Sequence, residues 1–288
     1  MTAALPTAAR IAAARAAHPL AFRAPLPVRL RRWALWAGFV GLFLYCLWLF
    51  DFSPLRIWTG IDRFGRIASF MFPPHVWDTW TEFAEILNGL GETLAMAFLG
   101  TVLGAVVAFP LSFLGAKNIN RLNFLRLGVR RGYDIIRAFE TLILALIFIR
   151  AFGLGPLAGI LAIAVSEIGV FAKLFSEAIE NSREGPVDGV KAAGGSRWQQ
   201  IRYGLLPQVN PVILSILLYN FESNVRSGTI LGIVGAGGIG YILSDRISAY
   251  RWDEAWSIIF LIIAMVYVID FLSGLIRARF IGTWEGTR

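Results

Sequence analysis

The sequence predicts an all-α integral membrane protein with about six transmembrane helices. Hydrophobic residues make up 57% of the chain and charged residues only 16%, against about 25% charged residues in an ordinary soluble domain. The apolar residues form runs of roughly 20, the length at which a helix crosses a bilayer. The 10 tryptophans and 22 phenylalanines suit aromatic belts at the two lipid–water interfaces.

The predicted spans follow directly from the apolar runs. Each run is long enough to form a transmembrane helix, with ends uncertain by a few residues because boundaries are the weakest part of such an assignment. They cover residues 33–50, 90–114, 139–157, 158–179, 209–234 and 256–275.

The segment 72–91, before the second span, is amphipathic rather than uniformly apolar. Pro73 and Pro74 suit a helix start, and acidic residues separate the aromatic and aliphatic ones. We expect a short helix along the outer interface. Its apolar residues recur at helical spacing and are Trp77, Trp80, Phe83 and Ile86.

The distribution of charge predicts that both termini are cytoplasmic, because cytoplasmic loops carry an excess of Lys and Arg. Residues 1–32 form a basic arm with no acidic residue, and no small-residue cleavage site follows the first apolar run, so we expect a retained anchor. Residues 33–288 form the predicted transmembrane domain. The loop after the second span is also basic, with only Asp134 opposing Lys117, Arg121, Arg126, Arg130, Arg131 and Arg137.

Composition argues against several other classes of protein. The net charge of +8 is explained by topology, so nucleic acid is not an expected partner. Cys46 is the only cysteine, and His18 and His75 lie far apart, so neither a disulfide within the chain nor a metal site is expected. A membrane-embedded enzyme would need an Asp, His or Cys cluster at an interface, and none is evident.

The segment 184–208, between the fourth and fifth spans, predicts two short helices below the membrane. Pro186 suits the first helix start, Gly194 and Gly195 stop that helix and allow a sharp turn, and Ser196 can cap the second. Val187, Val190 and Ala193 would share one face of the first helix, and Trp198, Ile201 and Leu205 one face of the second. Such a helix-turn-helix suits docking of a soluble partner.

This segment resembles the coupling loop of ABC importer permeases. In that pattern an acidic residue and two alanines precede a glycine, and a Leu-Pro ends thirteen positions beyond the glycine. Here Asp188, Gly189 and Val190 stand for the first three, Gly194 for the glycine, and Leu206-Pro207 for the end. The alanines are absent, and Gly204 replaces the usual branched residue. The resemblance implies that the loop contacts an ATPase through Asp188, Gly189, Gly194, Gly195, Arg197, Leu206 and Pro207.

A second stretch, 220–240, resembles the phosphonate permease branch of this superfamily. Segments 142–148, 153–159 and 169–180 are similar to the same branch, so the resemblance covers most of the chain from about Leu90. It implies an ABC importer permease (MetI-like) bundle in the bacterial inner membrane, importing a phosphonate, phosphite, phosphate or phosphate ester. The permease would have no catalysis and no cofactor of its own.

The resemblance also implies partners. These are a second permease copy forming a homodimer, two cytoplasmic ATPase subunits that bind ATP and Mg²⁺, and an extracytoplasmic binding protein. A permease for methionine or glycine betaine stays open as an alternative, because such permeases share the loop. A secondary transporter also stays open, although paired halves with broken helices are not found.

Polar residues inside the predicted spans are the candidates for a translocation path. Ionised groups are costly in lipid, so they should face the bundle interior or a water-filled path. In one interpretation, Arg226 helps to line the path of an anionic substrate, because a guanidinium group donates two hydrogen bonds to an oxyanion. In the other, Arg226 pairs with Glu222 one helical turn away and only stabilises the structure. Both interpretations stay open. Lys173 is a further charged residue in the fourth span, and the path candidates are Glu167, Glu222, Asn224, Arg226 and Ser227.

Gly235, Gly237 and Gly240 match a G-x-G-x-x-G dinucleotide-binding pattern. The preceding run is a membrane span and no βαβ unit surrounds it, so this interpretation is rejected. We expect a glycine-rich kink at the outer end of the fifth span, where small residues let helices approach closely.

Overall fold

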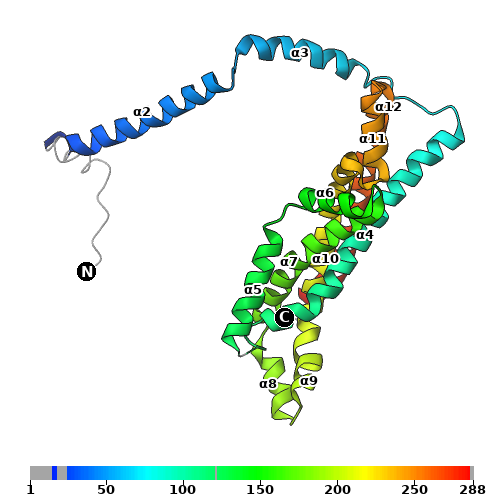
Figure 1. The fold of residues 1–288 in the computed structure, drawn as a ribbon. Helices are drawn as coiled ribbons and strands as arrows, with labels where there is room; N and C mark the ends of the chain where they lie inside the picture. Colours follow the sequence, from blue (N-terminus) through cyan, green and yellow to red (C-terminus); the bar gives the residue numbers. More distant parts are fainter. Residues whose placement is uncertain (1–14, 18–24, 121, 286–288) are drawn as a thin grey trace. The chain divides into compact units, whose positions relative to one another are not determined.

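The computed structural model describes residues 15–17, 25–120 and 122–285, and these residues form helices and no strands (Figure 1). The chain divides into two units, Met1–Ala68 and Ser69–Arg288. Of the predicted basic arm, residues 1–14 and 18–24 lie outside the described residues, as does Arg121. The all-α prediction is confirmed.

The first unit contains two described long helices, α2 (Leu26–Leu49) and α3 (Pro54–Ser69). α2 has apolar residues on all sides and no buried residue, and at 24 residues it is long enough to span a bilayer. It contains the first predicted span and Cys46. The helix α3 was not predicted from the sequence, although Ile57, Ile61 and Phe64 recur at helical spacing with arginines between them.

The second unit is a helical bundle. The second, fourth and fifth predicted spans correspond to three helices that are each more than 24 residues long. The sixth predicted span lies within the final long helix. The elements are α4 (Trp80–Gly115), α5 (Asn123–Arg137), α6 (Thr141–Phe152), α7 (Pro156–Glu180), α8 (Glu184–Ala192), α9 (Arg197–Gln199), η1 (Gln200–Leu205), α10 (Leu206–Leu231), η2 (Gly232–Ala236), α11 (Gly238–Ser248) and α12 (Trp252–Glu285).

Helices α4 and α7 pack in parallel along a seam of small residues. A Cβ atom at Gly100 would lie 2.6 Å from the Cβ of Ile163, and one at Gly104 would lie 2.7 Å from the Cβ of Glu167. Gly104 lies four residues after Gly100, and its partner Glu167 lies four residues after Ile163. The two helices therefore run in the same direction. Glycine is required because a larger side chain would hold the two backbones apart.

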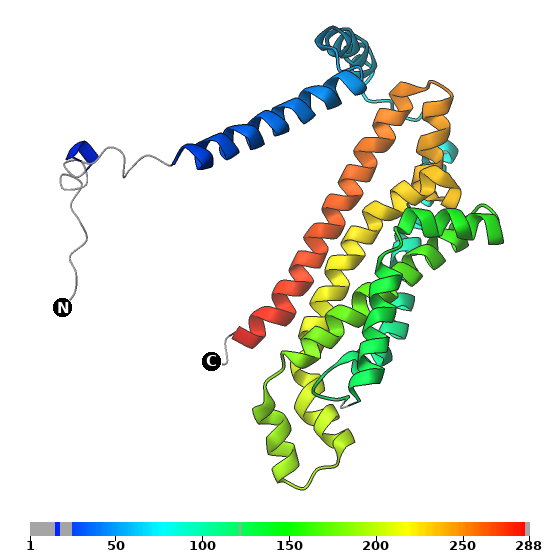
Figure 2. The same cartoon turned by 60° about the vertical axis from the view of Figure 1, so that its left-hand side comes forward.

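The parallel packing of α4 and α7 requires the chain between them to return across the bundle, and α5 and α6 do this together. At one end, Arg130 Nε of α5 donates to the Gly115 carbonyl at the end of α4, at 2.9 Å. At the other end, Leu144 and Ala145 of α6 pack with Met96 and Ala162. α6 itself lies at a steep angle to α7 (Figure 2).

The predicted third span, 139–157, therefore differs from the structure. Its helix is only 12 residues long, about 18 Å, whereas the hydrocarbon core is about 30 Å thick. Among the described residues, five helical segments are long and apolar enough to span a membrane, and they are α2, α4, α7, the segment 197–236 and α12. Between α4 and α7 the chain returns through α5 and α6 together, which apolar run length does not reveal because α5 is rich in arginine.

The glycine run after α10 forms the predicted kink. Gly235, Gly237 and Gly238 have φ values of +106°, +82° and +69°, which only glycine adopts readily. Beyond the kink, the Gly238 N–H donates to Glu92 Oε2 at 2.8 Å, and the Ile239 N–H donates to Thr93 Oγ1 at 2.9 Å. The side chains of α4 thus cap the start of α11, and the described part of the chain contains no strand that a dinucleotide-binding motif would need.

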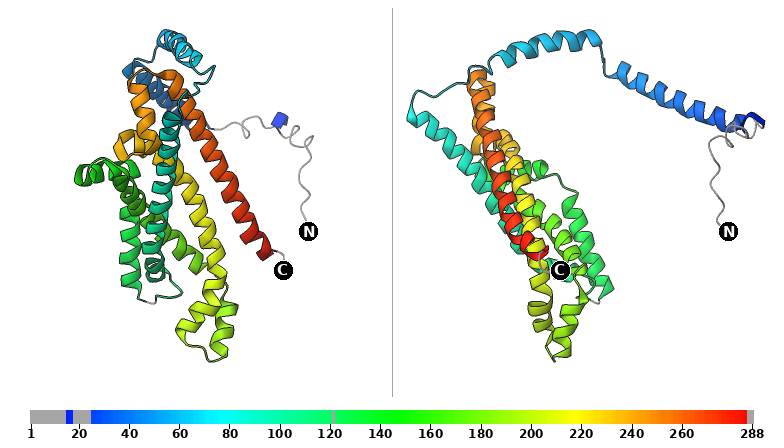
Figure 3. Two further views of the ribbon diagram at one scale, coloured as in Figure 1. Left: turned by 90° about the vertical axis from the view of Figure 1, so that its right-hand side faces the viewer. Right: turned by 180° about the vertical axis from the view of Figure 1, so that it is seen from behind.

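The last helix, α12, runs back beside α10 (Figures 2 and 3). Ala255 and Ile258 near its start pack with Ile86 and Ile239, whereas Arg277 near its end approaches Glu222 of α10. The end of α12 consequently lies on the same side of the bundle as the α8–α9 loop.

The predicted interfacial helix over 72–91 is wrong. Residues 72–79 form bends and irregular chain, and α4 begins at Trp80 and continues unbroken for 36 residues. Ile86 is buried against Ile239 and Ile258, so packing against α11 and α12 extends the span helix outward. Ile86 lies on the packed face of α4 and Phe83 is half-buried, whereas Trp80 is 73% exposed and Trp77 precedes the helix. Helical spacing alone does not distinguish a helix that lies at the interface from one that packs in a bundle.

We predict that Gly104→Leu destabilises the bundle, because the new side chain must displace Glu167 or separate α4 from α7. The overpacking should cost about 1–3 kcal/mol and lower the thermal midpoint in detergent by roughly 3–10 °C. Gly91→Leu is the matched control, since it lies on the same helix with open space around it. Equal midpoints for the two variants would refute the seam.

Candidate functional site

The α8–α9 loop projects from one end of the bundle as a compact helix-turn-helix (Figure 2). α8 ends at Ala192, and Gly194 turns the chain with a φ of +80°. The Ser196 N–H then donates to Gln199 Oε1 at 2.7 Å, as in a capping box. The predicted helix stop, turn and cap are confirmed.

Two glycines let the two arms of the loop pack closely. A Cβ atom at Gly195 would lie 2.8 Å from the Val190 carbonyl oxygen, and one at Gly204 would lie 2.8 Å from the Cα of Val187. This explains why Gly204 stands where the resemblance leads one to expect a branched residue: α8 passes against the backbone of η1 at that point.

Gln208 closes the base of the loop. Its Oε1 accepts from the Arg183 N–H at 3.1 Å, and its Nε2 donates to the Arg183 carbonyl at 3.1 Å and to the Gly204 carbonyl at 2.6 Å. One amide side chain therefore joins the chain entering the loop to the chain leaving it. Gln208 was not predicted as a functional residue, because its only signal in the sequence is a polar side chain directly after Leu206-Pro207.

The outer surface of the loop is exposed and carries both charge and aromatic side chains. Asp188, Gly189 and Arg197 are exposed. Ile201 and Leu205 share a face, as predicted, and pack with the buried core, but Trp198 is 82% exposed and does not join them. The cause is η1, a π-helical segment that changes the helical phase between Gln199 and Leu206.

A charged contact anchors the start of the loop to α4 and α5. Glu180, the last residue of α7, accepts from Arg130 at 2.6 Å and from the Lys117 N–H at 2.5 Å. Arg130 in turn donates to the Gly115 carbonyl. From the sequence, Arg130 was interpreted only as a basic residue that orients the chain in the membrane, and Glu180 only as part of a segment similar to the phosphonate branch. Their contact was not predicted because the two residues are 50 positions apart.

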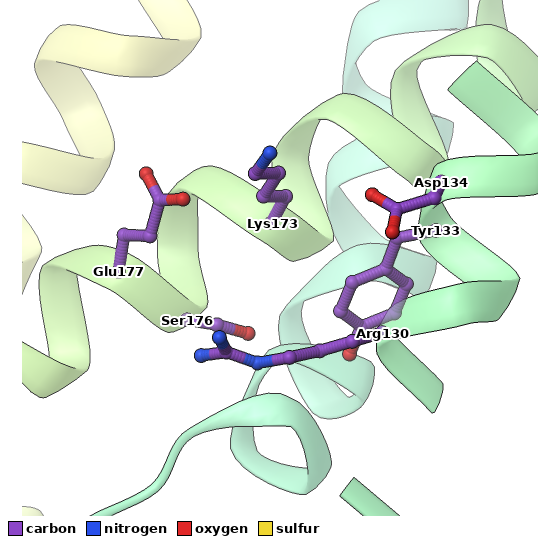
Figure 4. A pocket seen from close by; sticks show the side chains of 6 residues that line it. All are labelled: Arg130, Tyr133, Asp134, Lys173, Ser176 and Glu177. Carbon is purple, nitrogen blue, oxygen red and sulfur yellow. The ribbon is translucent and has the colours of Figure 1, made fainter. Parts of the chain in front are cut away.

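A small cavity of about 130 Å³ lies beside this contact, between α5 and α7 (Figure 4). Its lining mixes both signs of charge, so it does not define a site for an anion alone. Lys173, predicted as an intramembrane charge, lies here and away from the other polar candidates. The lining residues are Arg130, Tyr133, Asp134, Lys173, Ser176 and Glu177.

Three helices meet at a buried polar cluster inside the bundle. Asn224 Nδ2 of α10 donates to Glu167 Oε1 of α7 at 2.9 Å and to Thr101 Oγ1 of α4 at 3.0 Å. Glu167 is 6% exposed, and its Oε2 has no hydrogen-bond partner among the described residues. Gly104 makes room for this carboxylate. Thr101 was missed, although it lies between the seam glycines.

A second charged group lies on another face of α10, toward α12. Glu222 approaches Arg226 at 3.4 Å, as the one-turn spacing predicted, and also Arg277 of α12 at 3.8 Å. The side chain of Arg226 is 54% exposed, and Ser227 is half-buried. The structure thus separates Asn224, which contacts Glu167 of α7, from Glu222 and Arg226 on another face of α10, and does not join the five path candidates in one cluster.

The bundle is kinked after its third long helix, α10, and carries an exposed helical loop, and comparison with known proteins identifies its class. Residues 100–282 match the family of binding-protein-dependent transport system inner membrane components. HtxC of Stutzerimonas stutzeri, named for phosphite transport, is 38% identical over 79% of this chain and 79% of its own. The phosphate-import permease PhnE of Mycolicibacterium smegmatis is 36% identical over 89% of this chain and 48% of its own.

A solved structure shares the fold. The inward-facing methionine ABC transporter MetNI superposes with a TM-score of 0.63 at 22% identity, covering 70% of this chain and 99% of the compared chain. The chain belongs to the family of binding-protein-dependent transport system inner membrane components. It is therefore the inner-membrane permease component of an ABC importer.

We predict that Gln208→Leu loosens the loop. Losing the Gln208 hydrogen bonds, at about 1 kcal/mol each, should speed amide hydrogen exchange across residues 184–205 roughly tenfold or more. Hydrogen exchange with mass spectrometry on the membrane-reconstituted chain measures this. Asn210→Leu is the control, because Asn210 is exposed on the same helix; indistinguishable exchange in both variants would contradict the closing role of Gln208.

Proposed function

We propose that this permease imports a phosphonate or a related phosphorus oxyanion, such as phosphite, phosphate or a phosphate ester. The observation that carries the substrate class is the identity of 38% and 36% to permeases named for phosphite and phosphate transport, over most of this chain. The resemblance of 220–240 to the phosphonate branch points the same way. The methionine transporter supports the shared fold and not the substrate.

The proposed transporter contains two permease copies, two ATPase subunits on the cytoplasmic side and an extracytoplasmic binding protein. Both termini lie in the cytoplasm. The position of the α12 end on the loop side of the bundle supports this arrangement, as do the basic residues gathered there. ATP and Mg²⁺ bind to the ATPase subunits, and this chain contributes no catalytic group.

In this proposal the α8–α9 loop docks on the ATPase through Asp188, Gly189, Arg197 and its neighbours. Closure of the ATPase pair on ATP pushes the loop. The loop passes the motion to α7, and Glu180 passes it on to α4 and α5 through Lys117 and Arg130. Gln208 passes it to α10. The path between the two permease copies then opens alternately to each side.

Arg226 is the proposed anion contact of that path. Its side chain is more than half exposed on a helix inside the membrane, and an uncovered charge in lipid is costly. A second copy or a water-filled path would remove this cost. Glu222 also approaches Arg277, so it does not depend on Arg226 alone for a cationic partner.

The substrate class is tested by uptake into cells that carry or lack the gene. Cells carrying it should accumulate labelled methylphosphonate, phosphite or phosphate through this system, and cells lacking it should not. Labelled methionine and glycine betaine serve as comparison substrates. Uptake of only methionine or betaine would refute the assignment of a phosphorus oxyanion as substrate, while the assignment as an importer permease would stand.

For Arg226→Gln we expect a fall in oxyanion uptake of about tenfold or more, the effect of losing a charge-assisted hydrogen bond. The thermal midpoint should stay close to that of the unmodified chain, because Arg277 remains beside Glu222. Normal uptake combined with a lowered midpoint would instead identify the Glu222–Arg226 pair as structural.

For Gly194→Asp we expect loss of transport with normal insertion in the membrane. The substitution strains a residue whose φ is +80° and changes the angle between α8 and α9. Gly185→Asp adds the same charge to the same exposed loop at a glycine without positive φ, and should retain transport. ATP-dependent uptake and the amount of membrane-inserted protein are the two readouts; normal uptake by Gly194→Asp would refute the coupling role of the turn.

A further inference from the structure

Helix α3 has an apolar face that no other described residue of its own unit buries. None of its residues is buried, and the aromatic and aliphatic side chains along one stripe are exposed to solvent. On a helical projection this stripe falls within about one third of the circumference. Its exposed members are Ile57, Trp58, Ile61 and Phe64, and Ala68 at the end of the stripe is half-buried.

The opposite face of α3 is polar and basic. Arg66 approaches Asp62 one turn away at 3.9 Å, and Arg56 approaches Asp51 at 3.8 Å. Arg63 and Thr59 lie on the same face. The helix therefore has the composition of an amphipathic helix with a cationic side.

The chain leading into α3 restricts where the helix can lie. α2 is a membrane-spanning helix with no buried residue, and it ends at Leu49. Only residues 50–53 separate it from Pro54, and four residues reach at most about 14 Å. The start of α3 is consequently held at the membrane surface where α2 emerges.

α3 does not itself cross the membrane. Its 16 residues extend about 24 Å, less than the roughly 30 Å hydrocarbon core, and its arginines interrupt every possible apolar run. A helix that is too short and too charged to span, yet apolar on one face, is suited to lie in the plane of the interface.

We propose that α3 binds the lipid surface, with Ile57, Trp58, Ile61 and Phe64 inserted among the acyl chains beneath the headgroups. Arg56, Arg63 and Arg66 then lie at the level of the headgroups and favour anionic phospholipids. The contact holds the region between α2 and the permease bundle at the membrane. It requires no particular substrate or membrane face, so it stands independently of the proposed function.

The experiment compares the two faces of α3 in the full chain reconstituted in liposomes of phosphatidylcholine and phosphatidylglycerol. In a Cys46→Ser background, Ile61→Cys and Arg63→Cys each carry one environment-sensitive fluorophore. A nitroxide on the lipid acyl chain should quench the label at 61 at least about threefold more than the label at 63. Aqueous iodide should show the opposite order.

Two results would overturn the proposal. One is equal iodide quenching at both positions in the liposomes. The other is protection of position 61 that develops only when the extracytoplasmic binding protein is added, which would assign the apolar face to a protein partner.

A second pair, Trp58→Cys and Thr59→Cys, repeats the comparison in case labelling at Ile61 disturbs the helix. Replacing Arg63 and Arg66 by Gln should remove the dependence of lipid quenching on the fraction of phosphatidylglycerol. Because α2 keeps every variant in the membrane, loss of quenching reports release of α3 rather than loss of insertion. Unchanged dependence on phosphatidylglycerol would refute the headgroup contact.

Discussion

The close packing of α4 against α7 is the constraint on which the rest of the bundle depends. Gly100 and Gly104 let the two helices approach with their backbones in parallel. Within lipid this packing relies on van der Waals contact and interhelical hydrogen bonds, because burial of apolar surface contributes little there. The parallel direction forces α5 and α6 to return the chain across the bundle. The same approach brings Glu167 beside Thr101, where Asn224 of α10 joins them.

The same seam gives the α8–α9 loop a rigid base. Glu180 ends α7 and contacts Lys117 and Arg130, while Gln208 begins the return into α10. A force on the loop therefore reaches two groups of helices through short, charge-assisted or bidentate contacts. Gly194 turns the chain, and Gly195 and Gly204 let the two arms of the loop pack closely.

Local features were predictable wherever a residue acts on its own neighbours along the chain. The helix stop at Gly194, the cap at Ser196, the kink at Gly235 and the pairing of Glu222 with Arg226 all follow from backbone conformation or one-turn spacing. The interfacial helix over 72–91 was wrong because its periodicity fits a packed face equally well. Trp198 was placed on the wrong face because a π-helical segment changes the number of residues per turn. The usual spacing rules assume that this number is constant along the helix.

By itself the sequence determined that this chain is a helical membrane protein, where its long apolar helices run, and which loop carries the permease pattern, because hydrophobic run length and turn chemistry are local properties. Only the tertiary structure decided that α5 and α6 together return the chain from α4 to α7, that Arg130 and Glu180 hold the loop, and that the polar residues of α10 divide between two faces. Those outcomes depend on which helices become neighbours, and that is set by close packing between segments far apart in the chain.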